Sequence, residues 1–264
     1  MKNDQVIEKL RKRDFTAVIF DFDGTILDVK RALEKSIEEV FTEKGMETDL
    51  ESTVQEIGAV LESIQGYPIP KILLQSYDIF QQITALEKLS FLKKFRIALK
   101  IFAKYQTYSK EEAVLFPGIK TLLEYLYKGT ELFIISHNQT KNVLEHLQKE
   151  EIENYFKGVF GADELPDLKP SPEALLPVLK QYKNNKSKDF LILGDMPSDI
   201  ISGQEAGVHT IGIASGISKK EVLNQYSPDI LVDSITELLS MIGIENGRVS
   251  NSNPQNKSQL KIKS

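Results

Sequence analysis

Short apolar runs recur along this chain, and each is brief enough to form a single β-strand. Most are β-branched or aromatic, and most are followed by turn residues and then by a stretch with helical spacing. Continuous apolar runs of this length are typical of strands buried on both faces, as in a parallel sheet covered by helices. The alternation therefore predicts a doubly wound, Rossmann-like α/β domain. The runs are Ala17–Phe20, Leu132–Ile135, Val159–Phe160, Phe190–Leu193, Thr210–Ile213 and Ile230–Val232.

The pattern changes between Thr25 and Phe116, where no strand is expected. Apolar residues there keep helical spacing near 33–41, 54–64 and 83–108, with a break at 66–70. This predicts a helical cap domain, 26–116, inserted after the first strand into a core formed by 1–25 and 117–243. Because α/β sheets bind ligands beyond the carboxyl ends of their strands, an insertion at that point is placed to act as a lid.

Composition narrows the classes of function. The chain has 264 residues, a formal net charge of −5 and no cysteine. Disulfides, thiolate zinc sites and cysteine nucleophiles are therefore excluded, and a broad nucleic-acid-binding face is disfavoured. No segment approaches the about 20 apolar residues that cross a bilayer. We expect a cytoplasmic protein with no membrane span, either a monomer or a homodimer, and a disordered tail over 244–264.

Two carboxylates directly follow the first predicted strand, in the segment Asp21-Phe22-Asp23-Gly24-Thr25. Alternation along an extended chain points Asp21 and Asp23 to the same side. Two carboxylates at the end of a buried strand repel each other, and Mg²⁺, which prefers oxygen ligands, would relieve that repulsion. Gly24 permits a sharp turn. An ordinary strand-to-loop turn rich in Asp and Gly is the alternative.

Three further polar segments follow later in the chain. Gly194–Asp199 follows the strand Phe190–Leu193 and holds two acids, which could bind a cation or cap the next helix. Ser136, His137 and Asn138 follow another strand, and they could hydrogen-bond a phosphate oxygen or cap the next helix. Lys169 stands among prolines that stiffen its backbone. Taken singly, each segment leaves both interpretations open.

Taken together and in order, the four segments resemble the motifs of the haloacid dehalogenase-like (HAD) hydrolase superfamily. The matches are Asp21-x-Asp23-Gly24-Thr25, Ser136, Lys169 and Gly194-Asp195-x-x-x-Asp199, and the resemblance spans Phe15 to Leu239. The helical insertion is similar to the C1-type cap of the phosphoglycolate phosphatase-like branch.

The resemblance implies a role for each catalytic residue. Asp21 would be the nucleophile that forms an aspartyl-phosphate. Asp23 would be the general acid and base. Lys169 would pair with Asp21 and the phosphate. Dehalogenase members lack the second aspartate, so its presence at position 23 favours a phosphatase or phosphotransferase.

The resemblance also implies a magnesium site formed by Asp21, the backbone carbonyl of Asp23 and Asp195, with Asp199 either holding the water shell of the metal or orienting Lys169. Counting charge supports the cations independently, because four carboxylates with Lys169 and Mg²⁺ carry a net charge of −1. Without them, a phosphate dianion would meet four negative charges.

Substrate contacts divide between the core and the cap. Ser136, His137, Asn138, Gly24 and Thr25 are expected to bind the substrate, chiefly its phosphoryl oxygens. Asp28 is interpreted as a structural cap for the linker to the insertion. The cap residues that face the substrate are not fixed by the sequence, and the candidates are Lys30, Arg31, Tyr67, Arg96 and Lys100.

The sequence thus predicts a Mg²⁺-dependent phosphatase that acts on a small phosphorylated metabolite, with phosphoglycolate as the first candidate. A β-phosphoglucomutase-like phosphomutase is an alternative, although the Ser-Arg signature of those members is absent between Asp28 and Phe116. A pyrophosphatase or nucleotide phosphatase is a second alternative. A non-catalytic phosphate-binding module is disfavoured, since it would be expected to have lost Asp21 or Asp23.

Overall fold

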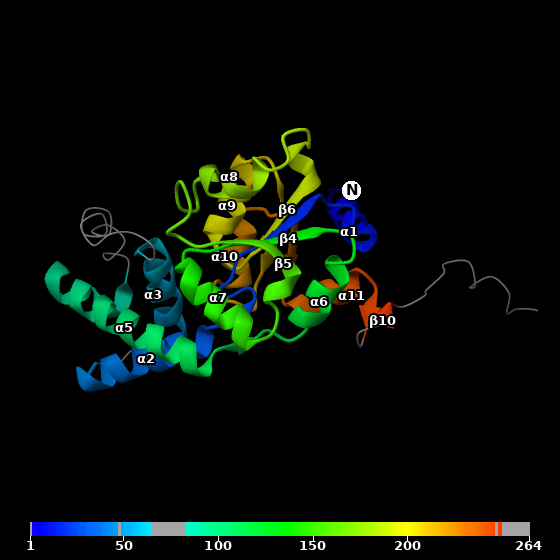
Figure 1. Ribbon diagram of the computed structural model, residues 1–264. Coiled ribbons are helices and arrows are strands. Elements are labelled where there is room, and N and C mark those ends of the chain that lie inside the picture. The colour runs from blue at the N-terminus through cyan, green and yellow to red at the C-terminus, as the bar shows by residue number, and fades with distance from the viewer. Residues whose placement is uncertain (1, 47–48, 65–82, 246–247, 250–264) are drawn as a thin grey trace, which may run out of the picture.

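The central sheet of the computed structural model is parallel, and its strands run in the order β5-β4-β1-β6-β7-β8 (Figure 1). The order extends outward from β1 in both directions, so the fold is doubly wound as predicted. The structure describes residues 2–46, 49–64, 83–245 and 248–249. The strands are β1 (Ala17–Phe20), β4 (Glu131–Ile135), β5 (Phe156–Phe160), β6 (Phe190–Gly194), β7 (His209–Ile213) and β8 (Ile230–Val232).

Helices cover both faces of this sheet, because side chains alternate along each buried strand. Val18 and Phe20 of β1 pack into one apolar layer, and Ala17 and Ile19 pack into the other. Figure 1 shows α8 and α9 on one side of the sheet and α6, α7 and α11 on the other. The core helices are α6 (Ile119–Leu126), α7 (Thr140–Lys149), α8 (Leu176–Leu179), α9 (Pro197–Glu205), α10 (Lys220–Gln225) and α11 (Ile235–Met241).

Short 3₁₀ turns join several of these elements, at Glu153–Tyr155, Pro172–Leu175 and Ser187–Asp189. Ser171 is the N-cap of the turn at Pro172, and its Oγ accepts a hydrogen bond from the backbone N–H of Glu173 at 3.3 Å, with proline in the first turn.

A helical insertion, which we define as residues 27–115, lies between β1 and α6. It holds α2 (Lys30–Glu43), α3 (Leu50–Ile64), a 3₁₀ turn (Thr84–Leu86) and α5 (Phe91–Glu112). Figure 1 shows these helices gathered beside one end of the sheet. The predicted break at 66–70 lies outside the described residues.

The insertion is not entirely helical, which corrects the expectation of no strand between Thr25 and Phe116. β2 (Leu27–Asp28) pairs antiparallel with β3 (Val114–Leu115) where the chain enters and leaves the insertion. Each strand has two residues, too few to show an apolar run. Asp28 lies at this junction, and its Oδ1 accepts a hydrogen bond from the Lys30 backbone N–H at 3.1 Å, at the start of α2.

Both ends of the core form regular elements. The charged amino-terminal segment forms α1 (Lys2–Lys12), which buries Val6 and Leu10 against the core. At the other end, β9 (Ile244–Glu245) pairs antiparallel with β10 (Arg248–Val249). The prediction that disorder begins at residue 244 is therefore wrong for these strands, while the tail from residue 250 lies outside the described residues.

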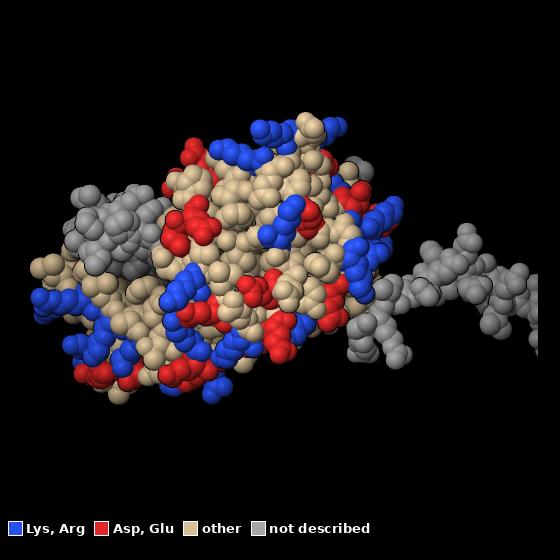
Figure 2. All heavy atoms as spheres, viewed as in Figure 1, with Lys and Arg blue, Asp and Glu red and all other residues tan. Residues whose placement is uncertain are grey.

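Figure 2 shows Lys and Arg side chains interspersed with Asp and Glu over the face in view. Within the described part of the chain, none of the helices combines the length and the apolar character needed to cross a membrane.

Candidate active site

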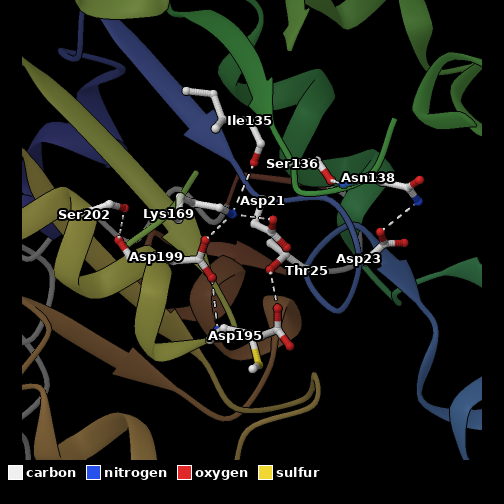
Figure 3. Close-up of polar contacts among 11 residues, drawn as sticks. Asp21, Asp23, Thr25, Ile135, Ser136, Asn138, Lys169, Asp195, Asp199 and Ser202 are labelled. Carbon is white, nitrogen blue, oxygen red and sulfur yellow. Dashed lines mark hydrogen bonds and ion pairs between the residues drawn. The ribbon is translucent and has the colours of Figure 1, made fainter. Parts of the chain in front are cut away.

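Three buried side chains meet at the carboxyl ends of β1 and β6. Asp21 follows β1 and continues its ladder, because its backbone N–H donates to the Leu193 carbonyl at 2.8 Å. The Lys169 Nζ lies 2.6 Å from Asp21 Oδ1 and 2.5 Å from Asp199 Oδ1 (Figure 3). It also donates to the Ile135 carbonyl at 3.3 Å. One ammonium group therefore joins Asp21 and Asp199 to the end of β4.

The protonation of this cluster depends on burial. Burial raises the pKa of Asp21 to about 7, although the charge of Lys169 opposes this and the charge of Asp199 adds to it. Burial alone would lower the pKa of Lys169, but the carboxylates of Asp199 and Asp21 outweigh it and raise that pKa above its usual value. Lys169 is therefore charged at neutral pH, whereas Asp21 in the metal-free protein is close to its midpoint.

Asp199 serves two structural purposes with its two oxygens. Oδ1 pairs with Lys169, while Oδ2 accepts a hydrogen bond from the Met196 backbone N–H at 3.0 Å, at the start of α9. The sequence left helix capping and a site role as alternatives for this acid. In the structure the Asp199 carboxylate does both, because it caps the start of α9 and also contacts Lys169.

Asp195 is enclosed by groups from two loops. Thr25 Oγ1 donates to Asp195 Oδ1 at 3.2 Å, and the Ile217 backbone N–H donates to Asp195 Oδ2 at 2.7 Å. Gly24 has a φ of +93° and lies against the same side chain, so a Cβ there would overlap the carboxylate. Gly24 thus permits both the turn and the close approach of Asp195.

Asp21, Asp195 and Asp199 form a set of buried carboxylates whose oxygens lie within 4.8 Å of one another. When all three are ionised, these carboxylates and one ammonium carry a net charge of −2, which is costly in a buried site unless a cation is bound. Carboxylate oxygens are the ligands that Mg²⁺ prefers. The residues present therefore fit a magnesium ion.

Asp23 stands apart from that set. It is half-buried, and Asn138 Nδ2 donates to its Oδ2 at 3.0 Å. Ser136 Oγ accepts from the backbone N–H of Asn138 at 3.0 Å, which fixes the turn that follows β4. His137 is buried in the same turn. The structure thus brings Asn138 to Asp23, the second carboxylate of the Asp21–Thr25 segment.

Those substrate-contact candidates predicted on the insertion that the structure describes do not lie with the site residues. Lys30, Arg31 and Arg96 are exposed, and Lys100 forms an ion pair with Glu43 on α2. Tyr67 lies outside the described residues. The structure thus places none of the four described candidates at the carboxylates.

The structure instead brings Tyr105 of α5 toward the site. Tyr105 is buried, and its pKa is raised by that burial and by the charges of Asp23, Asp195 and Asp21. Its position on the buried face of α5 was the only sequence signal, and apolar core residues share that signal.

Comparison with known proteins places this geometry in a family. The sequence profile of the haloacid dehalogenase-like hydrolases matches residues 18–213. A phosphoglycolate phosphatase of Vibrio parahaemolyticus is 25% identical over 238 residues, covering 89% of this chain and 99% of the relative. A phosphoglycolate phosphatase of Pseudomonas fluorescens is 27% identical over 226 residues, covering 84% and 78%.

Solved structures agree with the fold. The crystal structure of a predicted phosphoglycolate phosphatase from Haemophilus somnus superposes with a TM-score of 0.66 at 21% identity, covering 86% of this chain and 98% of that one. The family profile covers well over half of the chain and includes all four segments that meet in the site. The chain therefore belongs to the haloacid dehalogenase-like hydrolase family and is an enzyme of that family.

Proposed function

We propose that this hydrolase is a Mg²⁺-dependent phosphatase that hydrolyses a phosphate monoester of a small metabolite through an aspartyl-phosphate on Asp21. The observation that carries the proposal is the buried cluster of Asp21, Asp195 and Asp199 around Lys169. A phosphatase needs a nucleophile together with positive charge to offset the phosphate, and this cluster supplies both.

The metal would be held by carboxylate oxygens of Asp21, Asp195 and Asp199, with the Asp23 backbone carbonyl as a further ligand. When bound, Mg²⁺ supplies positive charge that offsets the repulsion between the carboxylate nucleophile and a phosphate dianion. Lys169 supplies the remaining positive charge from the chain itself.

In the first half-reaction, a carboxylate oxygen of Asp21 forms a bond to phosphorus and the bond from phosphorus to the leaving oxygen breaks. Asp23 gives its proton to that oxygen, so the product leaves as a neutral alcohol. Asn138 holds the Asp23 side chain in place through its 3.0 Å hydrogen bond. The products of this step are the alcohol and a phosphorylated Asp21.

In the second half-reaction, the ionised Asp23 removes a proton from water and the resulting hydroxide attacks phosphorus. The bond to Asp21 breaks, inorganic phosphate leaves, and both carboxyl groups return to their starting states. Ser136, the turn at His137 and Asn138, and the loop of Gly24 and Thr25 would contact the phosphoryl oxygens. The positions of Ser136, Asn138 and Thr25 around the carboxylates support this assignment (Figure 3).

The helical insertion would act as the cap over this site. Its helices adjoin the end of the sheet where Asp21 lies, and Tyr105 supplies a buried side chain in the field of the site carboxylates. A closed cap excludes water during the first half-reaction and restricts the site to small substrates. The curated relatives named as phosphoglycolate phosphatases support phosphoglycolate as the first substrate to test.

The proposal is tested by measuring phosphate release from phosphoglycolate, sugar phosphates, nucleoside monophosphates and pyrophosphate, with Mg²⁺ or with EDTA. We expect Mg²⁺-dependent release that favours one phosphate monoester and is abolished by Asp21→Asn. Release that survives in EDTA, or in Asp21→Asn, would contradict the proposed chemistry. Isomerisation of a sugar phosphate in large excess over phosphate release would show a mutase instead.

A further inference from the structure

A glycine in the middle of α3 marks a close contact between the insertion and the core. Gly58 is buried, and a Cβ at this position would lie 2.5 Å from Ile217 Cγ2 and 3.4 Å from Leu33 Cδ2. Glycine within a helix costs stability relative to alanine, so it is expected there only where packing leaves no room for a side chain. The α3 backbone therefore rests directly on the Ile217 side chain.

Ile217 also contacts the site, through its backbone N–H. The Ile217 N–H donates to Asp195 Oδ2 at 2.7 Å, and a Cβ on the preceding Gly216 would overlap the Asp195 carboxylate. Asp195 is fully buried. A single residue thus contacts α3 with its side chain and a site carboxylate with its main chain.

Two neighbouring contacts reinforce this link. Ser218 Oγ donates to the sulfur of Met196, the residue after Asp195, at 3.0 Å. Lys219 Nζ lies 3.1 Å from Glu51 Oε1, near the beginning of α3. The segment 214–219 therefore contacts α3 at two points and the Asp195–Met196 pair at two points.

We propose that segment 214–219 is a positioning element that orients Asp195 only while α3 is docked on Ile217. Docking of α3 presses the Ile217 side chain toward the core and holds its N–H on Asp195 Oδ2, which leaves Oδ1 directed toward Thr25 and the other carboxylates. Withdrawal of α3 frees the segment and loosens one ligand of the metal site. The consequence for catalysis rests on the proposed function, whereas the contact itself does not.

Two interactions of Ile217 have a fixed direction, namely the hydrogen bond from its N–H to Asp195 and the packing of its side chain against Gly58. A hydrogen bond from a backbone N–H fixes the rotamer of a carboxylate, and therefore the position that its other oxygen offers to a cation. Such positioning depends on the rigidity of the donor, and the donor here is a loop residue whose side chain is held by a helix of the insertion. The contact at Gly58 is therefore coupled to the metal site through the Ile217 side chain and the hydrogen bond from Ile217 to Asp195.

The test uses Gly58→Ala in the full-length protein, with three measurements. These are amide hydrogen exchange of peptides covering 214–219, Mg²⁺ binding to the metal-free protein by calorimetry, and phosphate release. The added methyl must displace α3 or Ile217, so we expect exchange at Ile217 and the Kd for Mg²⁺ each to rise by at least about fivefold. Ile217→Ala removes Cγ2 and makes room, so the double variant should return both values toward wild type.

Gln55→Ala on the same helix is the matched control, since it also raises helix propensity without adding a group against the segment, and we expect it to match wild type. Unchanged exchange at Ile217 in Gly58→Ala would overturn the proposal. Faster exchange with unchanged Mg²⁺ affinity would overturn it as well. A wild-type protein that binds no Mg²⁺ would overturn the proposed function, and the exchange comparison alone would then decide whether α3 holds the segment on Asp195.

Discussion

The Lys169 ammonium and the Asp21 carboxylate lie 2.6 Å apart at the end of β1, although 148 residues separate them in the chain. The same ammonium lies 2.5 Å from Asp199, so one buried cation serves two buried anions. Removing one partner of a buried ion pair leaves an uncompensated charge, which costs more than the pair contributes. This pairing joins the stability of the core to the chemistry of the site.

Lys169→Met should therefore lower both stability and activity. The unpaired carboxylates should reduce the free energy of unfolding by about 3 kcal/mol, and loss of positive charge at the phosphate should reduce kcat by at least about a hundredfold. Urea unfolding and phosphate release measure the two effects. Lys180→Met is the control on the exposed end of the neighbouring helix, and equal behaviour of the two variants would contradict the role given to Lys169.

Asp23→Asn should slow phosphoryl transfer to a degree that depends on the leaving group of the substrate. An alkyl phosphate needs a proton on the leaving oxygen, so its turnover should fall by at least about a hundredfold. Acetyl phosphate and p-nitrophenyl phosphate have good leaving groups, so they should still phosphorylate Asp21, and the phosphoenzyme should accumulate because no base activates water. A stopped-flow burst without steady turnover is the expected observation. Equal losses in the rate of phosphoenzyme formation for both substrate types would exclude Asp23 as the acid.

The raised pKa of Asp21 predicts a pH-dependent stability in the metal-free protein. Because this pKa is about 7 in the folded state against an ordinary 3.8, the folded state holds a proton that the unfolded state releases. The contribution of Asp21 to stability therefore falls as pH rises from about 4 to about 7.

Asp21→Asn has no such titration. In EDTA, its free energy of unfolding should improve relative to wild type between pH 5 and pH 8, by on the order of 2 kcal/mol. Chemical denaturation of both proteins at the two pH values measures this difference. A difference that does not change with pH, or that changes in the opposite direction, would contradict the raised pKa.

Tyr105 should contribute to substrate binding from the insertion. Its raised pKa keeps the phenol protonated at neutral pH, so it can donate a hydrogen bond to an anionic substrate. Tyr105→Phe should raise KM by about fivefold, the loss expected for one hydrogen bond, with little change in stability. Tyr108→Phe on the same helix is the control, because that hydroxyl bonds Glu39 on α2. Equal KM values for the two variants would show that Tyr105 does not contact substrate.

The sequence predicts the core sheet and the carboxylate site well, for physical reasons. Strands buried on both faces must be continuously apolar, so Ala17–Phe20 and Phe190–Leu193 are visible as runs. The polar residues that directly follow such strands share one edge of the sheet, and the structure accordingly brings Asp21 and Asp195 together. Lys169 has no such strand before it, and only the order of the motifs indicated its place.

The remaining features depend on contacts that leave no local pattern. α1 buries only a few apolar residues within a charged segment, so its sequence is typical of a solvated end. The contact of Gly58 with Ile217 joins positions far apart in the chain, and a lone glycine in a helix does not indicate its neighbour. Tyr105 shares the helical spacing of ordinary core residues, so its orientation toward the carboxylates required the folded structure.

The most direct test of the account asks where the phosphoryl group goes. The enzyme is mixed with acetyl phosphate and Mg²⁺, quenched in acid within milliseconds, digested, and mapped by mass spectrometry, with Asp21→Asn and Asp23→Asn in parallel. We predict a phosphoryl group on Asp21, more of it in Asp23→Asn, and none in Asp21→Asn. A phosphoryl group on another residue such as His137, or an adduct that persists in Asp21→Asn, would contradict the account.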